Sequence, residues 1–121
     1  MVVTVGLVGS GYMLAGMKQR RWKPSRTYDQ MIDEYVAVVG VQNPKVALEK
    51  LKAESALDVQ VKRNCHPLVH EIGRAAFRKY KDFSKAAAFL DETCSNGYIQ
   101  GVMEAYFGKK DDVIRKLKKV C

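Results

Sequence analysis

The run NCHPLVHE at residues 64–71 holds both histidines of the chain and is the stretch best suited to chemistry. His66 and His70 stand four positions apart, so on an α-helix both imidazole rings project from one face and can reach a single metal ion. The sequence suggests no cofactor other than a zinc ion or a haem held here. The predicted metal ligands are His66, His70, Cys65 and Glu71, with Cys94 or Glu104 as more distant candidates.

Two other interpretations of the histidine pair stay open. In one, His66 caps the first helical turn and His70 makes a single buried hydrogen bond. In the other, the pair performs general acid–base catalysis. The zinc-protease motif is not present, because Pro67 stands where that motif places its glutamate base. We therefore predict no catalytic residue and no enzyme.

The pattern CHPLVHEIGRAAFRKY, followed by a Cys-x-x-Gly-Tyr turn and then GVMEAYF, resembles a module of uncharacterised, mostly bacterial membrane-anchored or exported proteins. The resemblance covers residues 65–107. In similar sequences a histidine often stands at the position that Gln100 holds here. The resemblance implies a scaffold that has kept its shape and lost part of its chemistry. It also implies a site in relatives made by Cys65, His66, His70, Glu71 and Arg74.

Periodicity and punctuation predict an all-α fold, a small bundle of short helical hairpins over residues 25–121. Thr27 is suited to cap a helix that stops at Gly40, and Asn43 precedes a proline at the first position of the next helix. The run DVQVKR at 58–63 alternates weakly and predicts a short extended link. The expected helices cover residues 27–39, 43–54, 65–80, 84–93 and 98–107, and a last one begins at 111 or 112.

Small residues predict a close helix–helix contact in the second half of the chain. Gly97, Gly101 and Ala105 follow one another at intervals of four and form one shallow helix face. Gly73 lies on a helix that can pack against it. Because glycine inside a helix costs ~1 kcal/mol relative to alanine, close backbone approach has to offset that cost. Arg74, one turn beyond His70, is predicted to pair with Glu71 or Glu104.

Residues 2–17 are uncharged and are followed at once by Lys18, Arg20, Arg21, Trp22 and Lys23. As a helix this run would reach ~24 Å, somewhat less than the ~30 Å hydrocarbon core of a bilayer. We therefore divide the chain into an apolar N-terminal segment with a basic anchor, residues 1–24, and a helical domain, residues 25–121. Small residues four apart within the segment would let another membrane helix approach closely. These residues are Gly6, Ser10, Gly11 and Ala15.

Three alternatives for the N-terminal segment remain. It can be a cleaved secretory signal, although the cations of such signals precede the apolar run. It can be an apolar arm buried against a partner protein. The run VGLVGSGYM also resembles the opening of nicotinamide-dependent sugar dehydrogenases, with Gly9 and Gly11 as fingerprint glycines, but Leu14 stands at the third position.

The net charge of +8 belongs to the two ends of the chain. Residues 1–24 and residues 109–121 each carry a net +4, and residues 25–108 are balanced. A nucleic-acid-binding domain carries its excess on a folded face, so we do not expect nucleic acid as a partner. Basic ends instead suit anionic lipid, an acidic protein surface, or RNA within a larger particle.

The positive-inside rule places the helical domain on the cytoplasmic, stromal or matrix side of a membrane, because cations follow the apolar segment directly. Those compartments are reducing, so we expect Cys65 and Cys94 to be free thiols. A disulfide between them is the alternative for an oxidising space.

The sequence as a whole predicts a non-catalytic accessory or scaffold subunit of a larger, membrane-embedded complex, anchored by a single N-terminal span. Its expected partners are other protein subunits and membrane lipid. Two alternatives belong to other classes. One is a metal- or haem-binding redox module that uses His66 and His70, and the other is an RNA-contacting subunit of an organellar ribosome.

Overall fold

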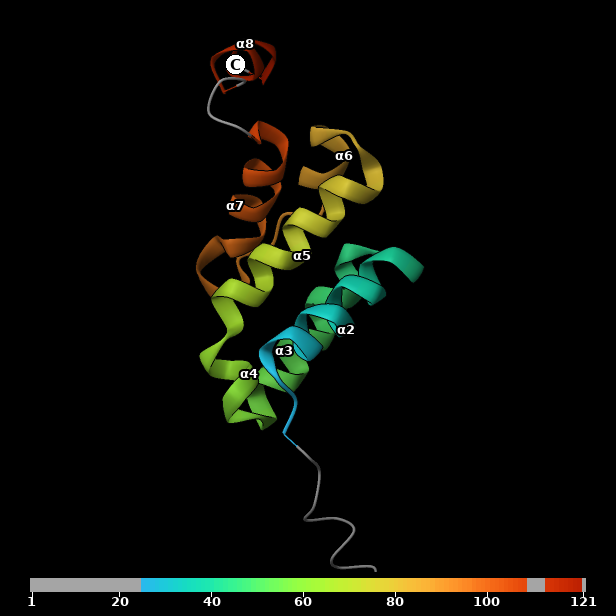
Figure 1. Ribbon diagram of the computed structural model, residues 1–121, viewed down its shortest axis with the longest axis vertical. Helices are drawn as coiled ribbons and strands as arrows, with labels where there is room; N and C mark the ends of the chain where they lie inside the picture. Colours follow the sequence, from blue (N-terminus) through green and yellow to red (C-terminus); the bar gives the residue numbers. More distant parts are fainter. Residues whose placement is uncertain (1–24, 109–112, 121) are drawn as a thin grey trace, which may run out of the picture.

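A computed structural model describes residues 25–108 and 113–120, and this part of the chain is helical without strands (Figure 1). The all-α prediction is confirmed. The predicted N-terminal helix, with Gly6, Ser10, Gly11 and Ala15, lies outside the described residues. The helices are α2 (Tyr28–Val41), α3 (Pro44–Leu57), α4 (Val59–Arg63), α5 (Cys65–Tyr80), α6 (Phe83–Ala87), α7 (Thr93–Phe107) and α8 (Val113–Val120).

Helices α2 and α3 begin where the sequence predicts. The hydroxyl of Thr27 accepts a hydrogen bond from the Gln30 N–H, and the Gln30 side chain accepts one from the Thr27 N–H, which completes a capping box. The side chain of Asn43 accepts from the Val46 N–H, and a proline opens α3. Helix α2 continues through Gly40, past its expected stop.

The extended link predicted for residues 58–63 is wrong, because these residues form the short helix α4. The carboxylate of Asp58 accepts a hydrogen bond from the Gln60 N–H at 2.8 Å and so caps the helix. Burial of Val61 on the core side completes the turn, while Val59 stays exposed. A local cap therefore outweighs a weak two-residue alternation. Helix α6 is also shorter than the predicted helix over 84–93.

Helix α5 is central and packs against α2, α3, α6 and α7 (Figure 1). Two tyrosines in the core are fully buried, and both of their hydroxyls have partners. Tyr35 donates to a carboxylate oxygen of Glu54, and Tyr98 donates to the Ala86 carbonyl at 2.6 Å. The core is therefore apolar except for hydroxyls that are hydrogen-bonded.

Glycines set the distance between α5 and α7. A Cβ atom built on Gly101 would lie 2.1 Å from the backbone oxygen of His70, and one built on Gly73 would lie 2.1 Å from that of Tyr98. A Cβ atom on Gly97 would lie 2.9 Å from a side-chain carbon of Val69. Backbone therefore meets backbone at this crossing, which brings side chains of α7 within reach of the histidine-bearing face of α5.

No helix in residues 25–108 or 113–120 is both long enough and apolar enough to cross a bilayer.

Candidate functional site

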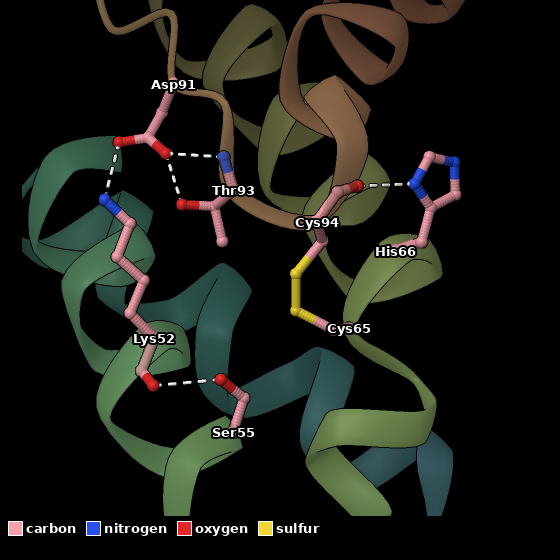
Figure 2. The surroundings of a disulfide bond; sticks show 7 residues. All are labelled: Lys52, Ser55, Cys65, His66, Asp91, Thr93 and Cys94. Carbon is pink, nitrogen blue, oxygen red and sulfur yellow. Dashed lines mark hydrogen bonds and ion pairs between the residues drawn. A yellow bond between two sulfur atoms is a disulfide. The ribbon is translucent and has the colours of Figure 1, made fainter.

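A disulfide joins Cys65, the first residue of α5, to Cys94 near the start of α7 (Figure 2). The expectation of free thiols is therefore wrong. That expectation took the redox state from the charges beside residues 1–24, whereas the close α5–α7 crossing brings the two Cα atoms to 5.8 Å. This separation is typical of a disulfide. Because its sulfur is bonded to Cys94, Cys65 is no longer a candidate thiolate ligand.

Asp91 fixes the chain just before Cys94. One carboxylate oxygen accepts a hydrogen bond from the Thr93 N–H at 2.8 Å, and the other accepts from the Lys52 ammonium of α3 at 2.9 Å (Figure 2). Burial opposes ionisation of this carboxyl, but the hydrogen bonds from Thr93 and Lys52 outweigh it and lower the pKa of Asp91. Asp91 thus connects the segment that precedes α7 to α7 itself, through Thr93, and to α3, through Lys52.

Residues 94–96 form a left-handed turn at the start of α7. Cys94, Ser95 and Asn96 have φ angles of 53°, 61° and 61°, in the region that non-glycine residues seldom adopt. Such conformations cost of order 1–3 kcal/mol each and persist only where the surroundings impose them. Here the turn directs the Cys94 carbonyl toward α5, where it accepts a hydrogen bond from His66 Nδ1 at 2.6 Å (Figure 2).

Both imidazole rings have their Nδ1 atoms occupied by acceptors. His66 Nδ1 faces a backbone carbonyl, and His70 Nδ1 lies 2.6 Å from Oε1 of Glu104. Burial opposes ionisation of Glu104, but hydrogen bonds from Arg74 and His70 outweigh it and lower the pKa of this carboxyl. A carbonyl and a carboxylate can only accept, so each Nδ1 carries the hydrogen.

When both rings are neutral, hydrogen on Nδ1 leaves a lone pair on each Nε2 atom, and the two Nε2 atoms face each other. His66 Nε2 and His70 Nε2 are 3.0 Å apart, with the ring planes inclined at 60°. The amide oxygen of Gln100 lies 3.0 Å from His70 Nε2. Turning the Gln100 amide would supply a donor to His70 but would leave the two imidazole lone pairs opposed. A cation, either a proton or a metal ion, is what this arrangement accommodates.

The remaining predicted residues lie beside this point. The Glu71 carboxylate accepts from the Arg74 guanidinium, which also donates to Glu104, with Arg74 Nε 3.0 Å from Oε2. Arg74 thus pairs with both predicted carboxylates, and Glu71 is turned toward it. Ala105, the residue after Glu104, lines a surface hollow together with Arg74, Gln100 and Glu104.

Gln100 is the contributing residue that ligand chemistry alone did not identify. Only the resemblance of residues 65–107 had drawn attention to its position. A spacing signal was present, because Gln100 and Glu104 are four apart on α7, as His66 and His70 are on α5. Within residues 25–108 and 113–120, no three His, Cys, Asp or Glu side chains converge as metal ligands. The third polar atom beside the two Nε2 atoms is the amide oxygen of Gln100.

The chain has no match among known protein families, curated proteins or solved structures.

Proposed function

We propose that the helical domain binds one divalent transition-metal ion between His66 Nε2 and His70 Nε2, with the amide oxygen of Gln100 as a third donor. The observation that carries the proposal is the 3.0 Å separation of two Nε2 atoms whose rings both have hydrogen on Nδ1. Two opposed lone pairs are unfavourable in an empty site and become favourable once a cation lies between them.

The geometry suits zinc. With zinc–nitrogen bonds of about 2.0–2.1 Å and tetrahedral angles, two imidazole nitrogens on one ion lie about 3.3 Å apart. The observed 3.0 Å needs an opening of only a few tenths of an ångström. Hydrogen bonds from Nδ1 to Glu104 and to the Cys94 carbonyl orient the rings as outer partners of metal-bound histidines commonly do.

A single ion is favoured over a haem. Two imidazoles on opposite sides of one iron would place their nitrogens ~4 Å apart, twice a metal–nitrogen bond, with the porphyrin between them. His66 and His70 project from one helix face with ring centroids 4.6 Å apart, and this spacing leaves no room for a macrocycle. Imidazole and amide donors without a thiolate suit zinc, copper(II) or nickel.

The role we propose is binding without catalysis by the chain itself. His66 is exposed and the His70 side chain is 16% exposed, so water or a donor from another molecule can complete the coordination. The accessory-subunit prediction stays a prediction, because residues 1–24, on which it depends, lie outside the described part of the chain.

Metal titration of the full chain tests the proposal. The experiment uses oxidised protein carrying Cys121→Ser, because this third cysteine is a competing zinc ligand. We expect one equivalent of zinc by calorimetry, and cobalt(II) absorption typical of nitrogen and oxygen ligands. His66→Ala and His70→Ala should each weaken binding at least ~tenfold, since each removes one of two imidazoles.

Gln60→Ala, on α4, is the matched control for Gln100→Ala. The first should leave zinc affinity unchanged, and the second should lower it. A stoichiometry below ~0.1 zinc per chain, with the disulfide intact, would refute the metal site and leave the proton as the cation between the rings. Unchanged affinity in His70→Ala would refute it equally.

A further inference from the structure

The chain enters the helical domain beside the junction of α3 and α4. Ser25, the first described residue, lines the same surface hollow as Leu57, Val59 and Gln60. Figure 1 shows the entering chain, in blue, and α4 at one end of the domain, with α8 at the opposite end. Residues 1–24 therefore join the domain at this end. We call residues 57–63 the α3–α4 corner.

The α3–α4 corner exposes two apolar side chains. Leu57 is 91% exposed and Val59 is 63% exposed. They flank Asp58, which ends α3 and caps α4, so the tight junction itself holds both side chains outward. Leu57 is the most exposed large apolar residue in the described part of the chain. Exposed apolar side chains that gather in one place are candidates for an interaction surface, and these two lie at the end where the chain enters the domain.

The charges around the corner favour an anionic occupant. The carboxylates near the corner have cationic partners, because Arg26 lies within 4 Å of both Glu54 and Asp58. The exposed cations Lys62 and Arg63 end α4. In the sequence, sixteen uncharged residues and then four cations precede Ser25, which lies beside the corner. Apolar residues flanked by Lys and Arg suit the interface of an anionic bilayer.

We propose that the α3–α4 corner rests on an anionic membrane surface, with Leu57 and Val59 in the interface and Lys62 and Arg63 at the lipid headgroups. The proposal is independent of metal binding. An apolar anchor alone would tether the domain to a membrane without fixing its orientation. Contact of the α3–α4 corner with the bilayer surface would fix that orientation.

Depth-dependent fluorescence quenching in the full chain tests the orientation. Trp22→Phe removes the one native tryptophan. Leu57→Trp then reports from the corner, and Val41→Trp is the control, because Val41 is 84% exposed and apolar. Val41 lies beside Lys79, whose ammonium contacts the Val39 and Gln42 carbonyls, near the far end of α5. Along α5 that is about 20 Å from the corner.

Both variants are reconstituted into phosphatidylcholine vesicles that contain phosphatidylglycerol and brominated lipid. We expect the tryptophan fluorescence of Leu57→Trp to lose about half of its intensity or more and to shift to shorter wavelength. The fluorescence of Val41→Trp should change little. Adding Lys62→Gln and Arg63→Gln should reduce the quenching in anionic vesicles only. Because all these sites are exposed, the variants should fold, and Val59→Trp gives a second reporter.

Equal quenching at both positions would overturn the proposal, since it would mean that the domain has no fixed face toward the membrane. Absence of quenching at Leu57→Trp and Val59→Trp would overturn it as well, and would leave the corner to a protein partner. Neither result bears on zinc binding, which is measured separately.

Discussion

Removing the disulfide should destabilise the domain and weaken the candidate site together. The bond joins positions 29 apart in the sequence, and the loop-closure entropy for such a loop corresponds to ~3.6 kcal/mol near room temperature. Without the bond, part of the cost of the left-handed turn at 94–96 is recovered if the turn relaxes. We therefore expect Cys65→Ala with Cys94→Ala to lower the free energy of unfolding by about 2–4 kcal/mol.

Urea unfolding followed by far-ultraviolet circular dichroism measures this loss, with Cys121→Ser as the control that should change nothing. A dithiol reductant added to the unmodified chain should reproduce the loss. Zinc affinity should fall as well, because Cys94 supplies the carbonyl that holds His66. Two results would refute the reasoning: an unfolding free energy within ~0.5 kcal/mol of the parent, or alkylation of both cysteines in the native chain without reductant.

Three further predictions concern the α5–α7 contact. Gln100→His should raise zinc affinity about tenfold by adding a third imidazole, measured by calorimetry, and an unchanged affinity would mean that the amide is not at the ion. Gly101→Ala should cost ~1–3 kcal/mol of stability in urea unfolding, because its Cβ would lie 2.1 Å from a backbone oxygen, whereas Gly40→Ala, with open space around it, should stabilise by up to ~1 kcal/mol. Glu104 has a lowered pKa, so its stabilising effect is full above the pKa of an unfolded glutamate, about 4.3, and is lost as pH falls through the lower folded value. The stability gap between the parent and Glu104→Gln should therefore close under acid, and a gap independent of pH would contradict this.

Much of the helical framework could be predicted from local signals. Thr27 and Asn43 are caps whose chemistry acts within three residues, so the sequence alone locates the starts of α2 and α3. The alternation of Val59 and Val61 favours an extended segment, but Asp58 caps a helix instead. The prediction of an extended link at α4 is therefore wrong. The prediction of free thiols at Cys65 and Cys94 fails for a different reason. It rests on charges in another part of the chain, whereas the distance between the two cysteines is set by the crossing of α5 and α7.

The candidate site shows the same division between local and long-range causes. The spacing of His66 and His70 predicts a shared helix face, and the structure places both rings there. The spacing alone does not show which ring nitrogens face each other. The orientation of the His70 ring is set by Glu104, 34 positions away, and that of the His66 ring by the Cys94 carbonyl, 28 positions away. Both partners are brought in by glycines that allow α7 to approach α5 closely. The chemistry at Nε2 is therefore a consequence of backbone packing, so a single methyl group at Gly101 should disturb zinc binding as much as the loss of a ligand.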